Sequence, residues 1–460
     1  MAFVFSCQTQ CMKPLRILCL LFICLVSISW QGREKKIGDP PRKAWMGVYG
    51  SFSARGMKVD SVANYSTLYD MGVMPGDTIL KLSGVAIADV DAYNDKAAEI
   101  RTNDPMSVVY KRGNKEVERK GIGKMRPFEQ NPLMEVVYDW TSVGECSLRT
   151  VVRKPFGMSN TLPAILLIPG YNCGSVENYN QGGYGKLIET WIQAGFVVVT
   201  IEKSGVGDSY GCVPCKEADL SLDIKVFDAG YKYMESLRYV DKRNLFIWGH
   251  SMGGIIAPLV AQNYKPRGVI VYATVYRPWS EFLLEMHRIQ WPLEGKTYAE
   301  TEDRLRLMQK VYYEFFRYKR SPRQLYQSAE FRDIVASEME YKPGKNEMWG
   351  RHWRFWQQLD SVDLARSWEA VNAPVLSIFG GADHVACSEL EHKLIVNTVN
   401  STHPGKATHL NIPDLDHLLT INPNHDSAHK NFMNAAYKKD HFHQAFADTT
   451  VWWMKEQVVH

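Results

Sequence analysis

Short apolar runs alternate with helical stretches through the middle of this 460-residue chain, and this alternation restricts the fold more than any other feature. Five such runs lie at residues 164–168, 196–201, 245–248, 268–272 and 375–379. Each run is too short for a buried helix and is almost continuously apolar, which is typical of strands covered on both faces. The sequence therefore predicts an α/β fold in which helices cover both faces of a mostly parallel sheet.

The composition is that of a globular protein with two or three domains. The chain is 45% hydrophobic, which is enough for large buried cores and excludes a disordered or fibrous protein. Its 54 Lys and Arg against 50 Asp and Glu leave a net charge of only +4. Because phosphate binding needs concentrated positive charge and no long basic run is present, we expect no nucleic-acid partner.

Residues 1–29 predict a secretory signal peptide. Lys13 and Arg16 precede an apolar stretch at 17–29 that ends in the small residues Ser27 and Ser29. This stretch is short for a permanent bilayer-spanning helix, and an uncleaved anchor is the alternative. No other segment is apolar enough to cross a membrane. We therefore expect an exported protein, periplasmic or secreted, with no stable transmembrane segment after cleavage.

Residues 42–124 predict a small mixed β domain. A turn at 72–79 leads into an apolar strand, a helix follows at 92–100, and a hairpin is expected at 106–119. This order, with the G-V-x-x-G-D-x-I turn, resembles a PDZ domain of the bacterial protease-associated kind. The resemblance implies a sheet edge that takes up a peptide strand, and a loop whose backbone N–H groups bind the peptide's terminal carboxylate. That loop comprises Trp45, Met46, Gly47 and Val48. A packing module that binds no peptide is the alternative.

A polar, Pro-bounded linker at 126–132 is expected to precede a second domain at 133–460. This domain opens with a predicted antiparallel strand pair at 136–140 and 148–153 and continues with the alternating runs. Before the last run lies an insertion at about 278–367, which is helix-rich by periodicity and dense in aromatic residues.

The pentapeptide Gly249-His250-Ser251-Met252-Gly253 carries the strongest chemical signal. It directly follows a predicted strand and precedes an apolar helical run, which is the context that a G-x-S-x-G nucleophile elbow requires. The glycines let the backbone turn so sharply that Ser251 Oγ projects above the sheet. A serine hydroxyl is a weak nucleophile, so a base must remove its proton.

An acid and a histidine follow in the order that such a site needs. Asp383 ends the Gly-rich turn after the fifth apolar run, at the strand end where open α/β sheets build their sites. His417 is the predicted base, and the acid would hold its imidazole in one tautomer. His384 and Asp416 are rivals, but each is adjacent in sequence to its partner, and adjacent residues rarely point at one another.

Two backbone N–H groups are expected to bind the oxyanion of an acyl-transfer reaction. One belongs to Met252, directly after the nucleophile. The other belongs to Tyr171 in the loop after the first apolar run, with Asn172 as the alternative. The Gly-rich turn at 202–209 is interpreted as a loop that braces this site.

Together these motifs resemble the α/β-hydrolase fold over residues 133–460, in particular bacterial esterases and the serine aminopeptidase-like branch. The resemblance implies that Ser251, Asp383 and His417 are nucleophile, acid and base, and that the insertion is a helical lid over the active site. Where many members have His-Gly and Asp-Arg, this chain has Pro-Gly at 169–170 and Glu-Lys at 202–203.

The resulting hypothesis is an exported serine hydrolase that cleaves carboxylic esters through an acyl-enzyme and needs no cofactor or metal. A serine peptidase on the same fold is the first alternative, and an aminopeptidase would need a lid carboxylate to hold the substrate's ammonium group. Four lid carboxylates are available, namely Glu281, Glu285, Glu294 and Glu300. A peptide-binding protein with an inactive hydrolase domain is the second alternative.

Five cysteines follow the predicted leader, so at least one is unpaired or intermolecular. They are Cys146, Cys173, Cys212, Cys215 and Cys387. The C-x-x-C pair has no second pair or nearby histidine pair to complete a zinc site, so one of its cysteines is expected in a structural disulfide with Cys173 as the favoured partner. The pairing itself stays open.

Overall fold

The computed structural model describes residues 40–180 and 182–459. The predicted signal peptide at 1–29 lies outside these residues. In the described part of the chain, no helix combines the length and the apolar character that a bilayer crossing needs.

An antiparallel sheet near the N-terminus has the strand order β1-β2-β3-β5-β6, with β4 paired to β3. Its strands are β1 (Val48–Ser53), β2 (Gly56–Val62), β3 (Thr78–Leu82), β4 (Val85–Ala86), β5 (Pro105–Arg112) and β6 (Lys115–Ile122), and its helices are α2 (Thr67–Asp70) and α3 (Val90–Glu99). The buried side chains of Leu68, Ile79 and Val108 lie in its core. β1 is an edge strand of this sheet.

The second sheet has eight strands in the order β16-β15-β12-β11-β9-β10-β8-β7. The strands are β7 (Glu135–Val143), β8 (Cys146–Lys154), β9 (Leu162–Ile168), β10 (Val197–Ile201), β11 (Val240–His250), β12 (Gly268–Tyr272), β15 (Val375–Gly380) and β16 (Ala407–Ile412). The six from β9 onward are parallel, whereas β8 runs antiparallel to both β10 and β7. The predicted mostly parallel sheet is therefore confirmed.

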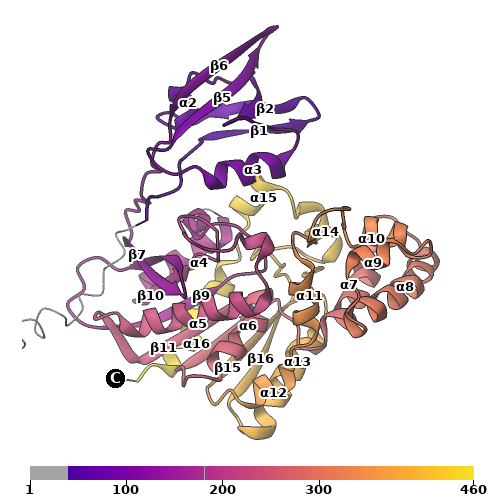
Figure 1. Ribbon diagram of the computed structural model, residues 1–460. Coiled ribbons are helices and arrows are strands. Elements are labelled where there is room, and N and C mark those ends of the chain that lie inside the picture. The colour runs from indigo at the N-terminus through magenta and orange to yellow at the C-terminus, as the bar shows by residue number, and fades with distance from the viewer. Residues whose placement is uncertain (1–39, 181, 460) are drawn as a thin grey trace, which may run out of the picture. The chain divides into compact units, whose positions relative to one another are not determined.

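Helices cover both faces of this sheet (Figure 1). One face carries α5 (Leu220–Ser236) and α6 (Met252–Ala261), and the other carries α4 (Gly182–Gln193) and α16 (Gln444–Gln457). Side chains alternate between the faces with the period of two expected of a strand, so that Ile247 packs toward α6 and Trp248 toward α4. The Trp248 ring lies 5.6 Å from that of Trp191, and both are fully buried.

The insertion between β12 and β15 is helical, as predicted from its periodicity. It comprises α7 (Trp279–Leu293), α8 (Tyr298–Tyr312), the π-helical turn η3 (Tyr313–Arg317), α9 (Pro322–Tyr326), α10 (Arg332–Ser337), α11 (Trp353–Asp360) and α12 (Leu364–Glu369). A short hairpin interrupts the helices, in which β13 (Glu347–Met348) pairs with β14 (Arg351–His352). The sequence did not predict it, because strands of two residues show no alternation of apolar and polar side chains. The remaining elements are η1 (Val176–Asn180), η2 (Cys215–Glu217), α13 (Glu389–Thr402), α14 (His425–Asn431) and α15 (Ala435–Asp440).

Candidate active site

Ser251 sits in the sharp turn between β11 and α6. Its backbone has φ 55° and ψ −123°, a conformation that costs a non-glycine residue free energy and marks the predicted elbow. A Cβ atom on Gly253 would lie 2.0 Å from the carbonyl oxygen of Ile168, so only glycine lets α6 approach the end of β9 this closely. Local sequence thus places the serine at the carboxyl edge of the sheet.

Asp383 and His417 form a buried hydrogen-bonded pair. His417 Nδ1 lies 2.9 Å from Asp383 Oδ2, while Asp383 Oδ1 accepts the N–H groups of Val385 and Ala386 at 2.8 and 2.9 Å. Burial raises the pKa of Asp383, but His417 and these hydrogen bonds outweigh it and hold the pKa below its usual value. Burial alone would lower the pKa of His417, but the nearby Asp383 carboxylate outweighs burial and raises the pKa above its usual value. With its Nδ1 proton directed to the carboxylate, His417 has Nε2 free to accept a proton.

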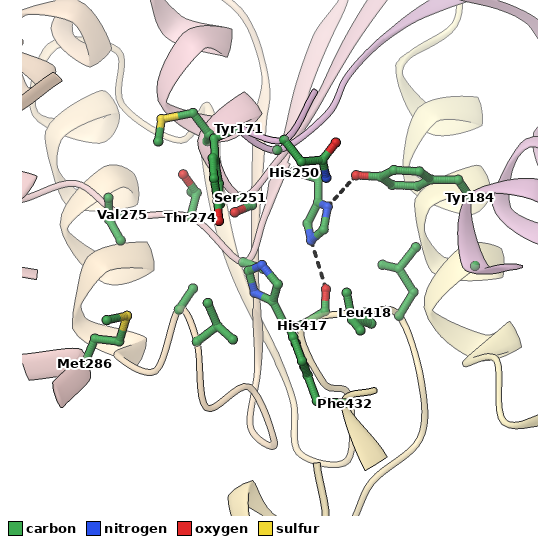
Figure 2. A pocket seen from close by; sticks show the side chains of 18 of the residues that line it. Tyr171, Tyr184, His250, Ser251, Thr274, Val275, Met286, His417, Leu418 and Phe432 are labelled. Carbon is green, nitrogen blue, oxygen red and sulfur yellow. Dashed lines mark hydrogen bonds between the residues drawn. The ribbon is translucent and has the colours of Figure 1, made fainter. Parts of the chain in front are cut away.

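Ser251 and His417 line one cavity of about 1160 Å³ (Figure 2). No hydrogen bond joins the two side chains, which is common in catalytic pairs before substrate is bound. The residues that sequence reasoning named as nucleophile, base and acid therefore meet at one place, from β11, the loop after β16 and the loop after β15.

His250 is not a rival base, because both of its ring nitrogens are occupied. Its Nε2 lies 2.9 Å from the backbone oxygen of His417, and its Nδ1 lies 2.6 Å from the hydroxyl of Tyr184 (Figure 2). Burial, followed by the charge of His417, lowers its pKa to about 3, so the ring is neutral. A neutral His250 with Nε2 protonated donates to the His417 carbonyl and accepts from Tyr184, which steadies the loop that carries the base.

The two rivals named from the sequence, His384 and Asp416, are engaged elsewhere. Burial lowers the pKa of His384 to about 4, and its ring packs against those of His429 and Phe432. The Asp416 carboxylate accepts hydrogen bonds from Thr420 and from neighbouring groups of its own loop. Asp416 therefore shapes the turn beside His417 and makes no hydrogen bond to the imidazole.

Both predicted oxyanion donors lie beside the nucleophile. Met252 is the first residue of α6, and Tyr171 and Met252 line the same cavity as Ser251. A Cβ atom on Gly170 would lie 3.5 Å from the Ser251 Cβ, so the loop after β9 passes directly over the elbow. The N–H of Tyr171 makes no hydrogen bond within the described chain.

The predicted bracing turn at 202–209 contacts this loop. The buried Glu202 carboxylate accepts the Ser175 hydroxyl at 2.5 Å and the Val176 N–H at 3.1 Å. Burial raises the pKa of Glu202 to about 7. Lys203, also buried, donates to the backbone carbonyls of Gly170 and Asn172.

The insertion between β12 and β15, called the lid below, supplies all three tryptophans of the cavity wall. The apolar lining residues from the lid are Trp279, Phe282, Leu283, Met286, Trp349 and Trp356. None of the four lid glutamates named from the sequence lines the cavity; Glu285, for example, pairs with Arg277. Glu340 lines it instead, with a positive φ of 53°. Sequence reasoning missed Glu340, because neither its φ nor its place in the cavity leaves a local signal.

The loop expected to bind a peptide carboxylate leads into β1, whose first residue is Val48. The N–H of Trp45 donates to the carbonyl of Lys124 at 2.8 Å, so the prediction that it binds a peptide carboxylate is wrong for this residue. The carbonyls of Trp45 and Met46 accept the N–H groups of Thr67 and Leu68, at 2.9 and 3.3 Å. Gly47 has φ 68°, and a Cβ there would collide with a neighbouring serine side chain, so this position requires glycine. The side chain of Met46 is buried.

Among the cysteines that the structure describes, Cys146 pairs with Cys212 and Cys173 with Cys215, and Cys387 is free. The expected bridge from Cys173 to one cysteine of the C-x-x-C pair is thus formed with Cys215. No cluster of His, Cys, Asp or Glu that could hold a metal ion occurs among the residues described.

The strand order, the elbow and the cavity at the carboxyl edge define an α/β-hydrolase. The chain belongs to the serine aminopeptidase S33 family, whose model matches residues 165–422. It is a hydrolase by fold and family.

Solved structures with this fold are distant. Est1E from Butyrivibrio proteoclasticus is 14% identical, over 70% of this chain and 98% of its own, with a TM-score of 0.42. The esterase Pf2001 of Pyrococcus furiosus is 11% identical, over 70% and 90%, with a TM-score of 0.41. DcsB, solved with a substrate analogue, is 15% identical, over 71% and 99%, with a TM-score of 0.43. No curated protein matches the sequence.

Proposed function

We propose that this protein is an exported serine hydrolase that cleaves carboxylic esters through an acyl-enzyme. The observation that carries the proposal is the Asp383–His417 hydrogen bond of 2.9 Å in the cavity that Ser251 also lines. Export rests on the basic-flanked apolar stretch at 17–29, and fractionation of cells that express the full-length chain tests it.

The mechanism follows from the positions of the proton carriers. Ser251 Oγ attacks the ester carbonyl while His417 Nε2 takes its proton, and the Asp383 carboxylate stabilises the imidazolium that forms. The N–H groups of Met252 and Tyr171 bind the developing oxyanion. The imidazolium then protonates the leaving alkoxide, and water, deprotonated by His417, hydrolyses the acyl-enzyme.

The cavity wall favours a substrate with an apolar acyl or aryl group. The indole of Trp279 stacks on that of Trp356 at 5.6 Å, and α7 adds Phe282 and Met286. These side chains bind apolar surface without selecting charge, so chain length and ring size are expected to decide turnover.

A panel of p-nitrophenyl esters and amino-acid anilides tests the proposal. We expect ester turnover that falls by at least about 10⁴ in Ser251→Ala and is unchanged in Ser401→Ala, an exposed serine on α13. Ester turnover that survives in Ser251→Ala refutes this mechanism.

A serine aminopeptidase is the second candidate, and Glu340 is the observation that favours it. Its carboxylate lines the cavity and raises the pKa of the Tyr171 phenol, an effect second to burial, so it lies near the oxyanion loop. If the substrate carries a free ammonium group, Glu340→Gln lowers kcat/KM for anilides at least tenfold and leaves neutral esters unaffected. Glu281→Gln, a lid carboxylate outside the cavity lining, is the matched control.

Peptide binding by the N-terminal sheet is a further part of the proposal. It is supported by the edge position of β1 and by the contact of Phe52 on β1 with Tyr93 on α3, whose rings lie 6.0 Å apart. Full-length Ser251→Ala protein is expected to bind peptides with a free C-terminal carboxylate and not their C-terminal amides. Equal binding of both forms argues against a carboxylate loop.

A further inference from the structure

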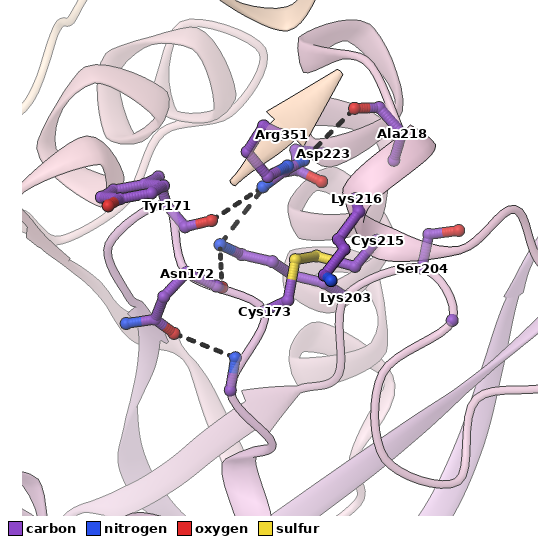
Figure 3. The surroundings of a disulfide bond; sticks show 12 residues. Tyr171, Asn172, Cys173, Lys203, Ser204, Cys215, Lys216, Ala218, Asp223 and Arg351 are labelled. Carbon is purple, nitrogen blue, oxygen red and sulfur yellow. Dashed lines mark hydrogen bonds and ion pairs between the residues drawn. A yellow bond between two sulfur atoms is a disulfide. The ribbon is translucent and has the colours of Figure 1, made fainter. Parts of the chain in front are cut away.

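Three consecutive carbonyl groups of the oxyanion loop accept hydrogen bonds from buried basic side chains. Figure 3 shows those of Tyr171 and Asn172. Lys203 Nζ donates to the carbonyl of Gly170 at 2.5 Å and to that of Asn172 at 3.0 Å. Arg351 Nη1 donates to the carbonyl between them, that of Tyr171, at 2.8 Å. No carbonyl from residue 170 to 172 is left to rotate freely.

A buried carboxylate holds the two basic groups together. Asp223 Oδ2 lies 3.0 Å from Arg351 Nη2 and 4.0 Å from Lys203 Nζ. Asp223 and Arg351 are fully buried and Lys203 is 3% exposed, so these interactions are hardly screened by solvent. Burial lowers the pKa of Lys203 to about 7, and even the neutral amine keeps two N–H donors for its two carbonyl partners.

Because the peptide bond is planar, a contact that fixes a carbonyl group also fixes the direction of the next residue's N–H group. In a trans peptide unit, the C=O of one residue and the N–H of the next point in opposite directions. The Lys203 contact with the Gly170 carbonyl therefore fixes the Tyr171 N–H, and the Arg351 contact with the Tyr171 carbonyl fixes the Asn172 N–H. Both N–H groups point away from the basic cluster.

The two contacts come from different parts of the chain. Lys203 follows β10, whereas Arg351 belongs to β14 of the lid, 180 positions from Tyr171. The Cys173–Cys215 disulfide anchors the end of the loop beside them (Figure 3). The oxyanion loop is thus tied to the sheet and to the lid together.

We infer that Lys203 and Arg351 are positioning residues for acyl transfer, which hold the oxyanion loop so that its N–H groups face the reacting carbonyl above Ser251. This inference rests on the proposed serine hydrolase function. Neither side chain lines the cavity, so they act through the backbone and not on the substrate.

The test compares Lys203→Met and Arg351→Met with the wild-type protein. For each protein, kcat and KM are measured with the best p-nitrophenyl ester, and Ki is measured for a trifluoromethyl ketone inhibitor. Such a ketone adds to the serine and forms an oxyanion, whereas KM reports mainly on ground-state binding. Loss of an oxyanion donor costs about 10²–10³ in kcat, so we expect a loss of about 10² in Lys203→Met. The ketone Ki should rise by the same factor, with KM within threefold of wild type. A larger loss in Lys203→Met than in Arg351→Met supports Tyr171 as the donor, and the reverse order supports Asn172.

Exposed basic residues supply the controls. Lys232→Met on α5 and Arg366→Met on α12 should keep wild-type kcat, and Arg351→Lys, which retains one donor, should recover part of the activity lost in Arg351→Met. If Lys203→Met does not fold, Lys203→Gln, a shorter neutral side chain that leaves the Arg351–Asp223 pair in place, gives the same readout.

The inference is overturned if folded Lys203→Met and Arg351→Met both keep kcat within threefold of wild type. It is also overturned if the loss in kcat is not matched by the ketone Ki. Failure of the proposed function looks different, because wild type and Ser251→Ala would then hydrolyse the ester equally.

Discussion

Replacing Asp383 by asparagine isolates the role of the carboxylate in the proposed triad. The two side chains have nearly the same shape, so the change removes a charge and little volume. Asp383 Oδ1 accepts two backbone N–H groups, from Val385 and Ala386. The amide oxygen of the variant should keep those two partners, which leaves its NH₂ group facing His417 Nδ1. That arrangement places the imidazole proton on Nε2, where it blocks proton transfer from Ser251.

The structure also gives the expected shift in the pKa of His417. A hydrogen bond to a charged group contributes about 1.5–3 kcal/mol, which corresponds to about 1–2 pKa units at 1.36 kcal/mol per unit. His250 shows what burial does without a carboxylate bond, because its ring lies 5.0 Å from that of His417 and its pKa is lowered to about 3. We therefore expect the raised pKa of His417 to fall below 6.5 in Asp383→Asn.

The assay is the pH dependence of kcat/KM for a p-nitrophenyl ester between pH 4 and pH 9. Because the base must be neutral, wild-type activity falls as the pH drops through the raised pKa of His417, and the acid limb lies above pH 6.5. In Asp383→Asn the limb should move about 1–2 units toward acid, and the plateau kcat should fall by about 10⁴.

Asp416→Asn is the matched control, since its buried carboxylate makes no hydrogen bond to the ring and its charge raises the pKa of His417 less than Asp383 does. It should move the acid limb by less than half a unit and keep kcat within tenfold of wild type. The reasoning is refuted if Asp383→Asn keeps wild-type kcat, or if Asp416→Asn reproduces its effects.

Three further predictions concern stability and specificity. Gly253→Ala should destabilise the fold by about 3 kcal/mol or more and abolish activity, because its Cβ would lie 2.0 Å from a backbone oxygen. Gly405→Ala, at φ 76° in open space, should cost only about 1–2 kcal/mol in the same urea titration. Cys173→Ala/Cys215→Ala opens a loop with a sequence separation of 42 and should lower the free energy of unfolding by about 4 kcal/mol, measured by urea titration; an unchanged midpoint contradicts this. Trp279→Ala removes part of the apolar wall and so enlarges the cavity, which should raise the ratio of long-chain to short-chain ester turnover at least about tenfold. A falling ratio would place the acyl group elsewhere.

Local patterns carried the prediction of the fold and of the proposed triad. Each parallel strand is a short contiguous run, and the elbow is five adjacent residues between a strand and a helix. Asp383 and His417 could be named because each ends a recognisable strand or turn in the order expected of the fold. These patterns can be recognised in the sequence because residues close together in the chain form them.

By itself, the sequence determined the mostly parallel sheet, the elbow at Ser251 and the residues that meet it. Only the tertiary structure decided the disulfide pairing, the carboxylate that lines the cavity and the groups that hold the oxyanion loop. Arg351 lies 128 positions from Asp223 and 180 from Tyr171, in a hairpin too short to show alternation. Contacts of this kind form between distant segments when the lid packs onto the sheet, so no periodicity or motif along the chain records them.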